Sequence, residues 1–234
     1  MLKLIKLEWK KNNIKKYTLK VLIMTAFLCL FLFALAFLGI AEDPDGTLDA
    51  AEGMNVISAP IELFTSMCFL IFTSVMLASF IVSAYKNKTM NLMFSYPIKR
   101  QRILASQMAA VWLFCLAALI AAKLVVYGCI YIGSQSMQSS FFIDFDMGSP
   151  SFYIQLLMKS VVTISMSFIA LFVGLIMKSS KAAIVTSFIL IFLTQASIGD
   201  FSLAGNLVLP VILTVVSFTF AVLSIMNAEK KDLL

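Results

Sequence analysis

The sequence contains no histidine, and charged residues fill only 13% of its 234 positions. Histidine is the most common general base and the most common metal ligand, so its absence removes both roles at once. A soluble domain has about a quarter of its residues charged and about half apolar. Here 61% of the residues are hydrophobic and the mean hydropathy is +0.99. These values argue against a soluble enzyme and a disordered chain, and they indicate a polytopic membrane protein.

Motifs for catalysis and metal binding are also missing. The chain has no G-x-x-x-x-G-K-[ST] phosphate-binding loop, no H-E-x-x-H, no G-x-S-x-G and no paired carboxylates within an apolar segment. The four cysteines lie singly in apolar stretches without a Cys-x-x-Cys spacing, and we interpret them as buried thiols that act as small apolar side chains. The sequence therefore predicts no catalytic residue, no metal site and no cofactor bound by this chain.

Six long apolar segments predict an all-α membrane protein formed by a single transmembrane domain over residues 1–234. The first has no charge over 21 residues, which as a helix measures about 31 Å, one hydrocarbon thickness. It lacks a small-x-small cleavage site, so we expect it to be retained rather than removed as a signal peptide. The third segment is longer than one crossing needs and the fifth is short. The expected spans are about 21–41, 61–84, 103–132, 152–177, 182–197 and 207–226.

The distribution of basic residues predicts the orientation. All but two of the 18 Lys and Arg residues lie on the side of the N-terminus, and the two exceptions are Lys123 and Lys159. Most of the 12 acidic residues lie on the opposite side. Because Lys and Arg are retained in cytoplasmic loops, we expect both termini in the cytoplasm. The basic residues are spread over four separate segments, so the net charge of +6 is a topology signal and does not predict nucleic-acid binding.

Residues 1–20 are predicted to form a basic interfacial helix ahead of the first span. Two apolar stripes would suit a helix placed between lipid and protein, and Trp9 is the natural interfacial anchor. The alternative is a plain basic anchor without a mechanical role. One stripe holds Leu2, Ile5 and Trp9, and the other holds Leu4, Leu7 and Ile14.

The connection between the second and third spans, residues 85–107, is the most informative segment. It has five basic residues and no acid, yet it also carries apolar side chains, among them Leu92, Phe94 and Tyr96. Pro97 disfavours helix at the preceding residue, so we expect a short cytoplasmic helix over about residues 89–96, capped by Thr89. Exposed apolar side chains in such a connection predict a docking surface. The alternative is a loop that packs against its own bundle.

This connection reads K-N-K-T-M-N-L-M-F-S-Y-P-I-K-R-Q-R-I-L-A-S-Q, and it resembles the corresponding segment of type-2 ABC-transporter permeases. These proteins often carry a similar Leu-x-Ser-x-Pro-x-x-Arg pattern, with six spans and cytoplasmic termini. The resemblance implies a coupling helix seated in a groove of a separate ATPase subunit, which would bind ATP and Mg²⁺. The residues it assigns to this contact are Thr89, Asn91, Leu92, Phe94, Ser95, Tyr96, Pro97 and Arg100. The chain departs from larger members because it has no big extracellular domain and no fused ATPase.

The same resemblance implies partners and a cargo. A second permease chain, identical or different, would complete the pathway in the plasma membrane of a bacterium. Small permeases of this type export amphipathic peptides, such as the cytolytic phenol-soluble modulins, or expel bacteriocins for self-protection. An apolar bundle with 21 Phe and 14 Met residues suits a cargo that enters sideways from the lipid.

Three charged residues fall toward the outer ends of the expected spans. Glu62 opens the second span, while Lys123 and Lys159 lie in the third and fourth. Ionisable groups within spans are costly and tend to face partners or water. We therefore consider an outer gate or a contact for charged cargo, against the alternative that the side chains reach the interface individually.

Other function classes are less favoured by the sequence. A secondary transporter is the main alternative, but it usually needs acidic residues at the membrane midplane, and none is evident. An intramembrane enzyme would need a buried catalytic dyad, and a purely structural anchor would leave the apolar cytoplasmic helix unexplained.

Overall fold

The computed structural model describes residues 2–11, 13–37, 58–82, 100–137, 145–177, 179–195 and 208–230. Within these ranges every regular element is helical and no strand occurs. The elements in chain order are α1 (Leu2–Lys11), α2 (Ile14–Phe37), α3 (Ser58–Leu77), the π-helix η1 (Ala78–Val82), α6 (Arg100–Met137), α7 (Pro150–Ile176), α8 (Ser180–Gln195) and α9 (Val208–Lys230).

Four of these helices are long and apolar enough to cross a membrane. Where the side chains of α8 and α9 are described, both helices are apolar, over residues 180–191 and 212–225. The protein is thus a helical, membrane-embedded protein, as its composition predicts, while the predicted fifth and sixth spans stay predictions. The four long segments are Ile14–Leu35, Ser58–Val82, Gln101–Gly133 and Pro150–Ile176.

The N-terminal region differs from the single interfacial helix expected over residues 1–20. The chain turns at Asn13, whose φ of 47° lies in the left-handed region that asparagine tolerates better than most residues. The short helix α1 therefore ends at Lys11, and α2 begins at Ile14. Residues 14–20 extend the first long helix, so Ile14 does not belong to an apolar stripe of α1.

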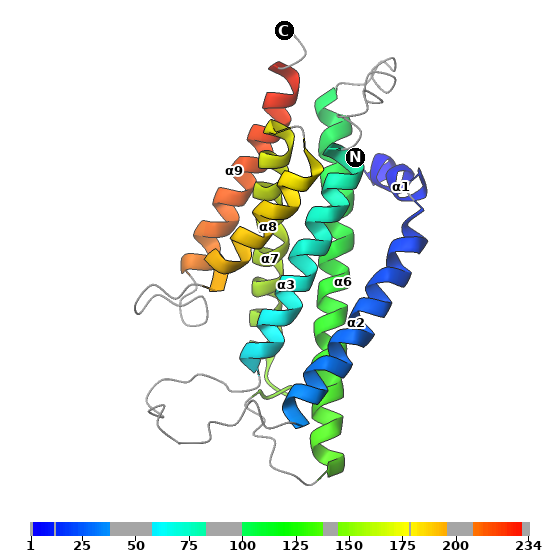
Figure 1. Ribbon diagram of the computed structural model, residues 1–234, viewed down its shortest axis with the longest axis vertical. Coiled ribbons are helices and arrows are strands. Elements are labelled where there is room, and N and C mark those ends of the chain that lie inside the picture. The colour runs from blue at the N-terminus through cyan, green and yellow to red at the C-terminus, as the bar shows by residue number, and fades with distance from the viewer. Residues whose placement is uncertain are drawn as a thin grey trace.

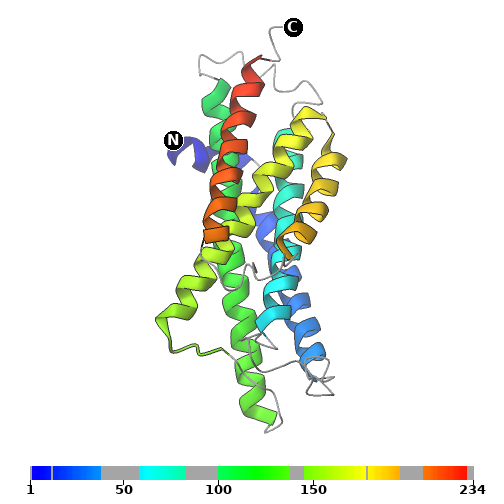
Figure 2. The ribbon, with the colours of Figure 1, turned by 90° about the vertical axis from the view of Figure 1, so that its left-hand side faces the viewer.

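The long helices run alternately up and down the bundle (Figures 1 and 2). One end of the molecule holds α1, the start of α6 and the last turns of α9, whereas α2 and α6 end, and α3 and α7 begin, at the opposite end (Figure 1). The helix α7 is central and packs against α3, α6, α8 and α9, whereas α2 lies at the edge and contacts mainly α6.

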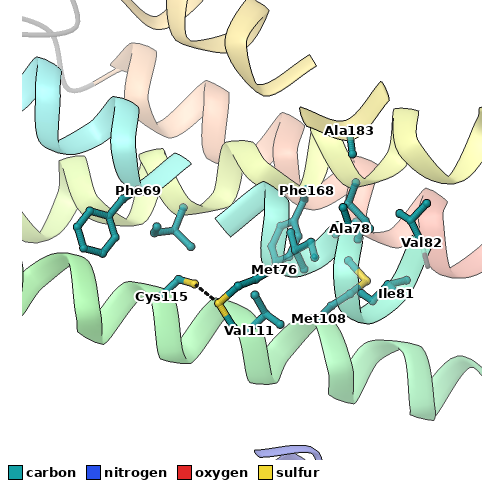
Figure 3. Packing of buried hydrophobic residues seen from close by; sticks show 14 of the residues in the cluster. Phe69, Met76, Ala78, Ile81, Val82, Met108, Val111, Cys115, Phe168 and Ala183 are labelled. Carbon is teal, nitrogen blue, oxygen red and sulfur yellow. Dashed lines mark hydrogen bonds between the residues drawn. The ribbon is translucent and has the colours of Figure 1, made fainter. Parts of the chain in front are cut away.

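The largest apolar cluster joins α3 and η1 to α6 and α7 (Figure 3). Met76 of α3 meets Cys115 of α6, with 3.8 Å between their sulfur atoms. The helices α7 and α8 approach closely at Gly174 of α7, where a Cβ atom would lie 2.7 Å from the Cβ of Ala183 in α8. The bundle is thus held by close helix packing, which is the main source of cohesion between helices in lipid.

Candidate functional site along helix α6

A buried ion pair joins α3 to α6. The Nζ atom of Lys123 donates a hydrogen bond to Oε2 of Glu62 over 2.6 Å, and the Lys123 side chain is 0% exposed. The hydroxyl of Tyr127 donates to the other carboxylate oxygen of Glu62 over 3.3 Å. Lys123 and Tyr127 are four residues apart, so they share one face of α6 and hold the carboxylate between them. Both oxygens of Glu62 therefore have a partner on the same helix.

Aromatic rings pack around Tyr127 on the side of α7. The Tyr127 ring packs edge-on against Phe145 and Phe152, with centroids 4.8 Å and 5.0 Å away. Phe145 precedes α7 in the chain, Phe152 lies in its first turn, and Phe145 is buried. These rings fix the orientation of the Tyr127 side chain, so its hydroxyl stays directed at Glu62.

Lys159 lies on α7 and is only partly buried. Its charge is close enough to Lys123 for the two to repel each other. The structure thus pairs Glu62 with Lys123 and leaves Lys159 as a nearby second cation outside that pair. The three charges lie on three different helices, and their sum is positive. Their role as an outer gate stays a prediction.

The N-terminal helix α1 docks on α6 nearer its start. The indole Nε1 of Trp9 donates a hydrogen bond to the backbone oxygen of Ala110 over 3.0 Å. The amide nitrogen of Gln107 donates to Oε1 of Glu8 over 3.4 Å. Ile5 is buried, whereas Leu7 is 61% exposed. The stripe that contains Ile5 and Trp9 therefore contacts the protein's own bundle, and the Leu7 side faces outward.

A small groove lies between α1, α3 and α6 at this contact. Trp9, Met76, Phe80 and Gln107 are among its lining residues, and it leaves no room for a water molecule. The Oε1 atom of Gln107 is buried without a hydrogen-bond partner in the structure. An unsatisfied buried acceptor is costly, so this contact is strong through Trp9 but imperfect around Gln107.

The residues predicted to contact an ATPase lie mainly outside the described residues. Thr89, Asn91, Leu92, Phe94, Ser95, Tyr96 and Pro97 all fall between η1 and α6, in the range 83–99. Arg100 is the first residue of α6, and its side chain is likewise not described. The predicted coupling helix therefore stays a prediction, but the element that follows it directly is known.

Sequence reasoning missed Tyr127 as a partner of Glu62. The spacing of four residues from Lys123 was the available signal, since it places both side chains on one helical face. Within the described residues, no group of three or more His, Cys, Asp or Glu side chains could hold a metal ion.

Comparison with known proteins gives little functional information. No protein-family profile matches the chain, and no solved structure matches it. The chain is 25% identical over 233 residues to the uncharacterized protein YcbO of Bacillus subtilis (strain 168), and the alignment covers 98% of this chain and 99% of that protein. The relative has nearly the same length, but its name states no activity. The function must therefore be argued from the residues themselves.

Proposed function

We propose that this chain is the permease subunit of a bacterial ABC exporter, in which a separate ATPase drives the export of hydrophobic or amphipathic cargo. The observation that carries the proposal is the continuity of α6. This helix begins at Arg100, immediately after the segment that resembles a coupling helix, and it continues without a break to Lys123 and on to Met137. One rigid element thus connects the predicted ATPase contact to the buried ion pair.

The proposed topology has six spans, with both termini in the cytoplasm of a bacterial cell. Its support is the placement of basic residues, because α1, the start of α6, the start of α8 and the last turns of α9 lie at one end of the bundle (Figures 1 and 2). These elements carry most of the Lys and Arg in the described chain. The helices α8 and α9 would form the fifth and sixth crossings.

In this mechanism α6 acts as a stiff rod. Its 38 residues span about 57 Å, longer than the membrane core. A displacement imposed at Arg100 by a moving ATPase would be transmitted to Lys123, while the Trp9 contact keeps α1 attached to the same rod. Separation of α6 from α3 at the other end would break the Glu62–Lys123 pair, which makes that pair a gate that opens only when the rod moves.

Two permease chains, identical or different, would enclose the cargo route. Amphipathic peptides are the proposed cargo, either cytolytic toxins or antimicrobial peptides. The support is compositional, because the outward faces of α2, α8 and α9 carry large apolar side chains that admit a cargo from the lipid side. ATP and Mg²⁺ would bind to the ATPase partner, and no catalytic group is assigned to this chain.

The test is reconstitution with the product of a neighbouring ATPase gene. In inside-out vesicles, ATP should drive accumulation of a fluorescent amphipathic helical peptide, and the variant Phe94→Ala/Tyr96→Ala should lose copurification or coupled transport. Ile154→Ala is the matched control, because Ile154 is 61% exposed near the start of α7, outside the faces assigned to the cargo and at the end of the bundle opposite the coupling segment. Wild-type copurification and coupling in the double variant would overturn the assigned contact.

A secondary, ion-coupled transporter is the second candidate. The specific observation that favours it is the buried Glu62–Lys123 pair itself, because ionisable groups within spans often form ion pathways. The two candidates differ in their energy source. Transport that persists without ATP and stops with a protonophore would favour the ion-coupled alternative, whereas strict dependence on ATP hydrolysis would exclude it.

A further inference from the structure

The helices α2 and α6 run in the same direction and meet near the end opposite α1 (Figure 1). At this crossing the ring of Phe33 lies against Gly133, so closely that a Cβ atom on Gly133 would be 2.5 Å from Cε2 of Phe33. Leu32 of α2 belongs to the same buried cluster as Val126 and Ile130 of α6. These contacts fix the register between the two helices.

The register brings two cysteines together. Cys29 lies four residues before Phe33, and Cys129 lies four residues before Gly133. Because both helices rise by about 1.5 Å per residue, equal offsets on parallel helices place the two thiols opposite each other. Cys29 packs against the buried cluster that holds Val126 and Ile130, which lie on either side of Cys129 in α6, and Cys129 is a side-chain neighbour of Cys29. Cys29 is partly buried and Cys129 is exposed, so Cys129 departs from the expectation of buried cysteines.

We propose that Cys29 and Cys129 form an intramolecular disulfide that links α2 to α6 under oxidising conditions. Two S–H bonds break and one S–S bond forms, while two protons leave and two electrons pass to an oxidant. The oxidant is a disulfide exchange partner, whose own S–S bond is reduced to two thiols. In the proposed orientation this end of the bundle faces the cell exterior, where disulfides persist.

The position of this bond determines its effect. The helix α2 has only 11% of its spanning window buried, and it contacts the rest of the bundle mainly through α6. A covalent link at the crossing therefore fixes the helix that is otherwise the most loosely attached of the four long ones. The two remaining cysteines are placed differently, since Cys115 is buried beside Met76 and Cys68 lies on α3.

The experiment uses the full chain in native membranes, treated with copper(II) phenanthroline as the oxidant. Each pair of thiols reduces two copper(II) ions to copper(I). After denaturation, free thiols are labelled with a polyethylene-glycol maleimide and counted by gel shift. In the variant Cys68→Ser/Cys115→Ser, the reduced protein should gain two labels and the oxidised protein none, without forming a covalent dimer. Mass spectrometry of wild-type protein should identify the same Cys29–Cys129 peptide.

The matched control moves one thiol by a single residue. Adding Gly128→Cys and Cys129→Ser to that variant places a thiol where a Cβ has no neighbour within 4 Å, so oxidation should not link it to Cys29. Equal linking in this control would overturn the register argument. An unlinked Cys29–Cys129 pair in protein that elutes as a single species in detergent, or a Cys129–Cys129 link between two chains, would overturn the proposal.

Discussion

At the scale of single residues, the Glu62–Lys123 pair is the most informative contact. Moving an ion out of water costs several kcal/mol even after relaxation, and this cost is offset only when partners saturate the charge. Lys123 is fully buried, and both carboxylate oxygens of Glu62 accept hydrogen bonds from α6. The two side chains therefore stabilise the bundle only as a pair. Either charged side chain without its partner would destabilise the folded protein.

The first prediction follows from this dependence. Glu62→Gln should destabilise the protein by about 3–5 kcal/mol, because it leaves the Lys123 ammonium buried without a counter-charge. The double variant Glu62→Leu/Lys123→Met should recover much of that loss, since no charge stays buried. Thermal unfolding in detergent, followed by tryptophan fluorescence, measures both. Lys159→Met is the control with little expected effect, and a double variant that is no more stable than Glu62→Gln would contradict the coupling.

The second residue-scale prediction contrasts two glycines. Gly174→Ala should destabilise the protein by about 1–3 kcal/mol, because its new methyl group would lie 2.7 Å from the Ala183 Cβ. Gly128→Ala meets nothing within 4 Å and should be neutral or stabilising by up to about 1 kcal/mol, through the better helix propensity of alanine. Unfolding temperatures of the two variants provide the comparison. Equal shifts would show that close packing at Gly174 is not limiting.

The ion pair also illustrates how far residue-level reasoning reaches. Three charged residues in expected spans could be singled out from the sequence, because charge is rare there. Which lysine pairs with Glu62 depends on the rotation of α6 against α3, and nothing local to either segment sets that rotation. The same reason explains why Tyr127 was missed, since a tyrosine near a span end is usual without any buried partner.

At the scale of elements, the sequence predicts the long helices well, but it does not predict where a helix breaks or changes type. The predicted second, third and fourth spans coincide with α3–η1, α6 and α7 to within about five residues, because uninterrupted hydrophobicity is a strong signal. The first long helix, α2, begins at Ile14, whereas the first span was expected from residue 21. The break at Asn13 was missed because asparagine is only a moderate helix breaker and the basic pattern continues across it. The π-helix η1 was likewise not predicted, because the apolar sequence of Ala78–Val82 does not differ from that of an ordinary α-helix.

The docking of α1 gives an element-scale prediction. Trp9→Phe keeps the ring but removes the hydrogen bond to Ala110, so it should weaken the attachment of α1 by about 1 kcal/mol. Faster cleavage within α1 in limited proteolysis would report this loosening. Leu7→Ala is the control, because an exposed side chain outside the contact changes stability by only about 0.5 kcal/mol or less. A larger effect at Leu7 than at Trp9 would show that α1 docks through the face that carries Leu7, and this would contradict the contact described here.

At the scale of the whole molecule, the charge distribution and the helix arrangement support each other. The basic residues were assigned to one side from the sequence alone, and the helices that carry them meet at one end of the bundle (Figure 2). This agreement is expected because alternating spans bring every second connection to the same face.

The orientation yields the last prediction, and the transport mechanism depends on it. Single cysteines are placed at two exposed positions in a background that lacks the four native ones: Asp146→Cys before α7 and Lys181→Cys at the start of α8. An impermeant maleimide added to intact cells should label the first and spare the second, because Lys and Arg hold the Lys181 end in the cytoplasm. Permeabilised cells should label both, which controls for reactivity. The reverse pattern in intact cells would invert the topology and place the segment that resembles a coupling helix outside the cell, where no ATPase could reach it.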